Sequence, residues 1–295
     1  MEINKILAEE FKLRQEQVVN TVALIDDGKT IPFIARYRKE LTGSLDDQIL
    51  RELSDRLTYL RNLEIRKSEV SSSIAEQGKL TEEISSALDK AETLVEVEDI
   101  YRPFKPKRKT RASIAREKGL EVLADLIGRQ DDKLDLHNEA QKFINVENGL
   151  ETEEEVIQGA SDIIAENVSD DAELRKSIRK LYEKAAKIES RASDENAETV
   201  YQNYYEFCEP VSKIADHRIL ALDRGEKEGA LKVSVSIDEE FCFSIAERKY
   251  VINNTDSGNI VKAAVQDSCK RLIMPSVERE IRAELTARAA EGAIK

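Results

Sequence analysis

The chain has 295 residues, of which 59 are acidic and 46 basic, and its formal net charge is −13. Hydrophobic residues make up 40%, enough for a folded core, whereas aromatic residues make up only 5% and tryptophan is absent. This balance excludes a disordered tail and favours long, solvated helices over a β-sandwich or barrel. We therefore predict a mainly α fold.

The N-terminal region predicts a helix, a tight turn and a second helix. Apolar residues follow the helical period over residues 18–25, Gly28 is a stop signal, and Pro32 opens the next segment. Three cations fall at the exposed end of that segment: Arg36, Arg38 and Lys39. A helix-turn-helix element would present cations there to a phosphate backbone. From the pattern alone, an ordinary helical hairpin with a basic rim is the simpler interpretation.

The following segment predicts one long amphipathic helix. Ser44 and Asp47 form a capping signature, and leucine or isoleucine then recurs every three or four residues towards Gly78. A helix of about 30 residues would be about 45 Å long. We expect such a helix over residues 45–77 to act as a spine against which shorter helices pack.

A run of seven cations with no carboxylate among them interrupts the helical pattern beyond this spine. The cations are Arg102, Lys105, Lys107, Arg108, Lys109, Arg111 and Arg116. Pro103 and Pro106 predict an extended loop within the run. A helix should begin after Thr110, with Arg111 and Arg116 near its start, where cations oppose the helix dipole. Such a run needs something negative opposite it, because like charges repel.

The second half of the chain predicts more helices and little β structure. Helices are expected over residues 152–167 and 170–191 and again from Gly258 onward. Only the stretch LKVSVSID, from Leu231, alternates as a strand does. We predict three parts: a helical domain at 1–130 with the helix-turn-helix-like element and the basic loop, a helical extension at 131–210, and a helical segment with a short β element at 211–295.

No pattern in the sequence predicts catalysis, a cofactor or a metal site. The cysteines are far apart and lack metal-ligand or disulfide spacing: Cys208, Cys242 and Cys269. His137 and His217 belong to no ligand pair. The segment LDRGEKEGAL has two glycines but not the spacing of a phosphate loop. We therefore predict no enzyme activity, no cofactor and no metal.

The chain also shows no membrane signal. Its first residues alternate apolar and charged positions, unlike a signal peptide, and no apolar run approaches the roughly 18 residues that span a bilayer. The overall negative charge would be repelled by anionic lipid. We expect a cytoplasmic protein that does not bind membranes.

Four blocks of the sequence resemble the bacterial transcription accessory protein Tex family. They are TIPFIARYRKELTGSLDD at 30–47, VEDIYRPFKPKRKTRASIAREKGLEVLADLI at 97–127, HRILALDRGEKEG at 217–229 and REIRAELTARAAEGAIK at 279–295. The blocks run in family order over essentially the whole chain. The resemblance implies a helical N-terminal portion, with a helix-turn-helix-like element, of a protein that binds nucleic acid and affects transcription.

The resemblance also implies that this chain is a fragment. Family members continue into an RNase H-like domain, helix-hairpin-helix units and a C-terminal OB-fold RNA-binding domain. We expect this chain to stop before them, and so to lack the principal nucleic-acid-binding module.

Two functional hypotheses follow. In the first, the chain is a non-enzymatic scaffold that supports RNA or DNA binding by the full-length protein. Its candidate phosphate contacts are Arg36, Arg38, Lys39, Lys105, Lys107, Arg108, Lys109 and Arg111. In the second, the chain is a protein-interaction module that docks RNA polymerase or another transcription protein, and the basic run is an internal clamp on acidic helices such as 152–156. We expect Arg102 and Arg111 to lie inside or between domains, and the residues 105–109 to be exposed.

Overall fold

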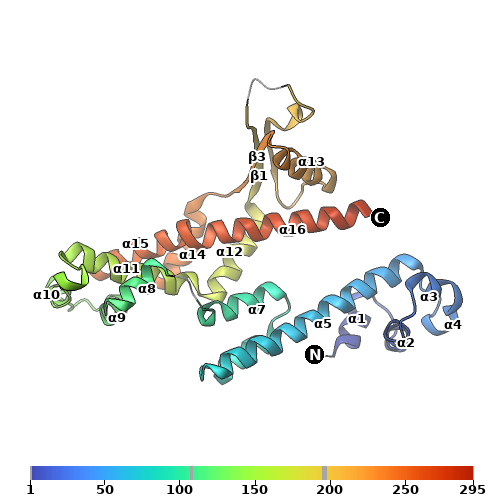
Figure 1. Ribbon diagram of the computed structural model, residues 1–295, viewed down its shortest axis with the longest axis horizontal. Helices are drawn as coiled ribbons and strands as arrows, with labels where there is room; N and C mark the ends of the chain where they lie inside the picture. The colour runs from blue at the N-terminus through green and yellow to red at the C-terminus, as the bar shows by residue number, and fades with distance from the viewer. Residues whose placement is uncertain (1, 107–108, 195–197, 295) are drawn as a thin grey trace. The chain divides into compact units, whose positions relative to one another are not determined.

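The computed structural model describes residues 2–106, 109–194 and 198–294 (Figure 1). Helices dominate it, and one small three-stranded antiparallel sheet completes the fold. The predicted mainly α class with a minor β element is confirmed. The chain divides into two compact units, Met1–Phe104 and Lys105–Lys295, which we call unit 1 and unit 2. The three-part division proposed from the sequence stays a prediction.

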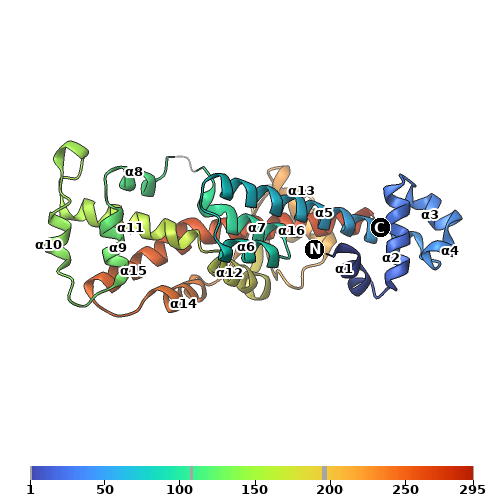
Figure 2. The same cartoon turned by 90° about the horizontal axis from the view of Figure 1, so that it is seen from below.

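Unit 1 is built on a single long helix. Its helices are α1 (Ile3–Glu10), α2 (Gln15–Asp26), α3 (Ile31–Tyr37), α4 (Lys39–Thr42), α5 (Asp47–Glu76), α6 (Glu82–Lys90) and α7 (Leu94–Tyr101), followed by a 3₁₀ turn, Arg102–Phe104. The first four gather around the N-terminal part of α5, and α6 and α7 lie along its other end (Figure 2). The predicted spine helix is confirmed. Its N-cap is Asp46, whose Oδ1 accepts a hydrogen bond of 2.8 Å from the Ile49 N–H.

The spacing of apolar residues on α5 explains how it organises unit 1. From Leu50 to Ile74 a buried residue recurs at every third or fourth position, and each is leucine, valine or isoleucine except Lys67, which places a continuous stripe on one side of the helix. The N-terminal part of the stripe packs against Leu7, Val18 and Ile34 of the first three helices. The C-terminal part packs against Leu88 and Val97 of α6 and α7. One helix thus supplies a side to every core cluster of the unit.

Unit 2 combines a helical bundle with the sheet. Its elements are α8 (Arg111–Glu117), α9 (Glu121–Arg129), α10 (Leu136–Gln141), α11 (Glu153–Ser169), α12 (Ala172–Ala185), β1 (Lys187–Ala192), β2 (Glu206–Pro210), α13 (Asp216–Lys227), β3 (Leu231–Ser236), α14 (Glu239–Tyr250), α15 (Asp256–Asp267), a π-helical turn (Ser268–Ile273) and α16 (Met274–Ile294). The strand order is β2-β1-β3. Helix α13 packs along the C-terminal part of α16, β3 of the sheet contacts the first turns of α16 at Glu278, and α8 to α11 lie towards α15 (Figure 1).

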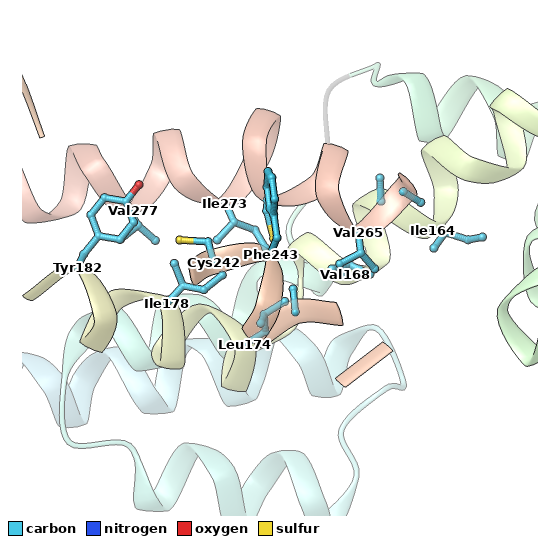
Figure 3. Packing of buried hydrophobic residues seen from close by; sticks show 14 of the residues in the cluster. Ile164, Val168, Leu174, Ile178, Tyr182, Cys242, Phe243, Val265, Ile273 and Val277 are labelled. Atoms are coloured by element: carbon cyan, nitrogen blue, oxygen red, sulfur yellow. The ribbon is translucent and has the colours of Figure 1, made fainter. Parts of the chain in front are cut away.

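One continuous hydrophobic core runs through unit 2. Figure 3 shows its centre, where Ile178 and Tyr182 of α12 face Cys242 of α14 and Val277 of α16. Burial raises the pKa of the Tyr182 hydroxyl, the Cys242 thiol and the Cys269 thiol, and it brings the two thiols to about 11 and about 12. These cysteines are neutral core residues at physiological pH.

The structure corrects several details of the predicted elements. The helix expected over 170–191 ends at Ala185, and the residues that follow form the central strand β1. Strand β2 was not predicted, and helices α13 and α14 lie in the predicted helical segment 211–295 without predicted bounds of their own. The helix expected after Thr110 is divided in two at Gly119, which adopts a φ of 81° that favours glycine. Strand β3 is confirmed.

Candidate nucleic-acid interface

The first group of predicted cations lies where α3 meets α4 in unit 1. Ile34 is fully buried against Leu45 and Leu50, which fixes α3 on the spine helix. Arg36 and Lys39 are exposed, and neither forms an ion pair with any residue that the structure describes. The guanidinium carbon of Arg38 lies 5.6 Å from the centroid of the Phe33 ring. Two of the three predicted cations are therefore available to an outside anion.

The backbone here follows the predicted order of helix, turn and helix. Gly28 closes α2 with a φ of 73°, and α3 begins three residues later. The first turn of α3 carries Ile31, Pro32 and Phe33, which offer no hydrogen-bonding side chain to a base edge. The cations lie at the opposite end of the helix. This arrangement suits contact with phosphates better than recognition of base edges. A DNA-binding role for the element stays a prediction.

The second group, the basic run, starts unit 2. Lys107 and Arg108 lie outside the described residues. Arg102 belongs to unit 1 and lies 3.8 Å from the carboxylate of Asp99 (Nη2 to Oδ1), and Lys105 is half-buried. Lys109 and Arg111 are exposed, and neither has an ion-pair partner within the described parts of the chain. Arg111 is thus at the surface of unit 2 rather than inside it.

Arg116 has a different role from its neighbours, because it fastens α8 to α11. Its guanidinium contacts Glu166 at 2.5 Å (Nη1 to Oε2) and Asn167 at 2.8 Å (Nη2 to Oδ1). Thr110 donates to the other oxygen of the same carboxylate at 3.0 Å. Burial alone would lower the pKa of the Arg116 guanidinium, but the hydrogen bond to Glu166 together with the charges of Glu166 and Glu121 outweighs this effect and raises the pKa. Arg116 is therefore an internal clamp.

The basic run consequently divides between the two interpretations that the sequence left open. The clamp interpretation holds for Arg116, whose partner lies 50 residues further along the chain. Lys109 and Arg111, on the loop and the first helical residue that this clamp holds in place, have no such partner in the described residues. Both cations are therefore open to solvent and accessible to an outside anion.

Other kinds of site have little support in the part of the chain that the structure describes. No group of three or more histidine, cysteine, aspartate or glutamate side chains there could hold a metal ion. Cys208 is exposed, whereas Cys242 and Cys269 are buried in the core. Among the described helices, none combines the length and the apolar character that crossing a membrane requires.

Comparison with known proteins places this mainly helical chain in a family. Residues 1–75 match the family model described as the Tex-like protein N-terminal domain, and residues 131–295 match the model described as Tex central region-like. The second match alone covers more than half of the chain. The chain belongs to the Tex family, and the predicted resemblance is confirmed.

The relatives are longer proteins. YdcI of Bacillus subtilis is 45% identical over 98% of this chain and 41% of its own length. The transcriptional accessory protein Tex of Neisseria gonorrhoeae is 40% identical over 80% of this chain and 31% of its own length. The human S1 RNA-binding domain-containing protein 1 is 30% identical over 96% of this chain and 30% of its own length. The chain thus spans about two fifths or less of these relatives.

Proposed function

We propose that this chain is a non-enzymatic helical scaffold of a Tex-like transcription accessory factor, and that it supports nucleic-acid binding by the full-length protein. The observation that carries the proposal is the pair of exposed cations, Lys109 and Arg111, held in place by the clamp of Arg116 on Glu166. The names of two relatives, a transcriptional accessory protein and an S1 RNA-binding domain-containing protein, support it.

The physical case rests on where negative charge is missing. Although the chain has a net charge of −13, its residues 102–116 include seven cations and no carboxylate. Within this run, Lys109 and Arg111 are exposed and form no ion pair with a described residue. A phosphate backbone provides regularly spaced negative charges for such cations and releases counterions on contact. Arg36 and Lys39 form a second exposed group of the same kind on unit 1, and Arg38, Lys105, Lys107 and Arg108 complete the proposed set.

The test is a salt titration of binding to single-stranded and double-stranded RNA and DNA. We expect the double variant Lys109→Gln/Arg111→Gln to bind all sequences more weakly. Two lost phosphate contacts should reduce the log-log salt slope by about 1.4 units on single strands and about 1.8 on duplex DNA. The matched control is Lys213→Gln/Lys227→Gln, which removes two other exposed lysines. Equal slopes for the two double variants would refute a specific role for Lys109 and Arg111.

The proposal includes a location for the full-length protein. A cytoplasmic location fits a bacterial transcription factor, because transcription takes place there.

The alternative function is that of a protein-interaction module that docks RNA polymerase or another transcription protein. One observation favours it: a pocket in unit 2 has an apolar floor and exposed aliphatic side chains beside it.

A further inference from the structure

A pocket of about 380 Å³ opens among four helices of unit 2, α9, α11, α14 and α15. Its floor is apolar and consists of Ala124, Ile164, Val168 and Val261, which are all buried. Its rim carries Asp125 and Arg129 of α9, Asn167 of α11 and Tyr250 of α14. Ligand pockets commonly combine an apolar floor with a few polar groups of this kind. The pocket is large enough for one aliphatic or aromatic side chain.

Two exposed aliphatic side chains flank the pocket. Val122 is 61% exposed, and it shares a face of α9 with Asp125 and Arg129, three and seven residues further on. Ile252 is 73% exposed and follows α14 by two residues. Its N–H donates to Oε1 of Gln130, next to Arg129, at 2.9 Å, which places it at the same end of α9. Apolar groups around an apolar pocket are typical of protein-protein interfaces.

Two charged side chains on the rim have no ion-pair partner in the described parts of the chain. Asp125 and Arg129 stand four residues apart on α9, a spacing at which an acid and a base commonly pair on a helix. Both side chains are exposed, yet neither forms an ion pair with the other or with any further residue in the described parts of the chain. A partner that fits this rim carries a basic group for Asp125 and an acidic group for Arg129.

Gly128 supplies an independent sign that the pocket is kept open. It is a helical residue near the end of α9, where glycine is less favourable than alanine by up to about 1 kcal/mol. A Cβ built on it would have no heavy atom within 4 Å, so close packing does not demand glycine. Its φ is not positive, so backbone conformation does not demand glycine either. The missing side chain widens the pocket.

We propose that this pocket is a docking site for a polypeptide segment of another protein. The segment carries one apolar anchor residue, which enters the pocket, with a basic residue on one side of it and an acidic residue on the other. Complementarity to Asp125 and Arg129 and the flanking Val122 and Ile252 assign this occupant. A nucleobase fits less well, because the floor is aliphatic rather than aromatic. This inference is independent of the phosphate contacts proposed above.

The experiment measures binding of fluorescent peptides to this chain by anisotropy. Three peptides share a glycine-serine background: leucine flanked by lysine before and glutamate after, the same with the two charges exchanged, and the first with alanine in place of leucine. We expect the chain to prefer one charge order and to bind the alanine peptide at least ten times more weakly. Gly128→Leu should fill the pocket and weaken binding of the preferred peptide at least tenfold without lowering the melting temperature.

Two further variants separate the pocket from unspecific attraction. The exchange Asp125→Arg/Arg129→Asp should invert the preference between the two charge orders. Val200→Asp alters an exposed valine that does not line the pocket and should leave binding unchanged.

Several results would overturn the proposal. They are equal binding of the leucine and alanine peptides, unchanged binding in Gly128→Leu, or no effect of the charge exchange. Sensitivity to Gly128→Leu found only for a single-stranded oligonucleotide would assign the pocket to a base instead. A dimer, seen by sedimentation and abolished by Gly128→Leu, would assign it to a second copy of this chain.

Discussion

Two regions of the molecule use the same ionic chemistry in different surroundings. In unit 2, Arg175 and Arg179 of α12 both bind Glu280 of α16, at 2.9 and 2.7 Å. In unit 1, Arg56 of α5 makes two hydrogen bonds to Glu10 of α1, at 2.6 and 2.8 Å. The bond lengths are alike. Exposure differs, because the Arg175 side chain is 1% exposed, whereas the Arg56 side chain is 34% exposed.

The comparison teaches that burial, rather than bond length, decides how much such an ion pair contributes to the free energy of unfolding. Burial alone would raise the pKa of Glu280, but the hydrogen bond from Arg179 and the charge of Arg175 lower it. A buried arginine that loses its carboxylate keeps a charge that water cannot reach. An exposed arginine that loses its partner is solvated at once. The same substitution should therefore have very different effects in the two regions.

The largest expected effect is that of Glu280→Ala. Removing this carboxylate takes away the anion that Arg175 and Arg179 share between α12 and α16, so we expect the free energy of unfolding to fall by about 3–5 kcal/mol. Urea denaturation followed by circular dichroism measures it. Glu284→Ala, an exposed position on the same helix, is the control and should change little. A loss below about 1 kcal/mol for Glu280→Ala would contradict the role of burial.

An intermediate effect is expected at the start of unit 2, where the comparison recurs within one helix. Arg116→Gln removes the clamp on Glu166, which is largely buried, so we expect a loss of about 1–3 kcal/mol. Arg111→Gln alters an exposed residue of the same helix, and its effect should stay within about 0.5 kcal/mol. Thermal melts of the two single variants test this. Equal melting temperatures would show that Arg116 is no more structural than Arg111.

Local sequence signals predicted those helices whose own residues supply a regular apolar spacing or an N-cap. The spine α5 has apolar residues at helical spacing over 30 residues, and α8 begins at the cap of Thr110, whose side chain accepts from the Ser113 N–H. Strand β1 was not predicted, because its sequence, KIESRA, follows α12 without a signal that ends the helix. Its register depends on β2 and β3, which lie many residues further along the chain. Local spacing does not encode such pairing.

The candidate site was predictable in composition but not in roles. The sequence displays the run of cations, and its prolines predict an extended loop. It does not separate Arg116 from Arg111, because the partner of Arg116 is one of 59 acidic residues and lies far along the chain. The docking pocket was missed as well. Its one local signal is Gly128 inside a segment with a helical pattern, a position where glycine needs a reason.

The smallest expected effect is that of the exposed pair Arg56 and Glu10. Arg56→Ala also removes a contact with Tyr59, whose ring centroid lies 5.1 Å from the guanidinium carbon, so the single variant overstates the ion pair. A double-mutant cycle with Arg56→Ala and Glu10→Ala isolates the pair. We expect a coupling energy of about 0.2–1 kcal/mol, because both groups stay partly hydrated.

The salt dependence of the two coupling energies gives a second test of the contrast between the buried and the exposed ion pair. The Debye length falls from about 10 Å at 0.1 M to about 3 Å at 1 M salt, so the coupling between Arg56 and Glu10 should shrink over this range. The coupling between Arg175 and Glu280, measured by the same cycle, should change much less, because solvent ions do not reach the buried guanidinium. Equal salt dependence of the two coupling energies would mean that water enters between α12 and α16, and the contrast between the two regions would fail.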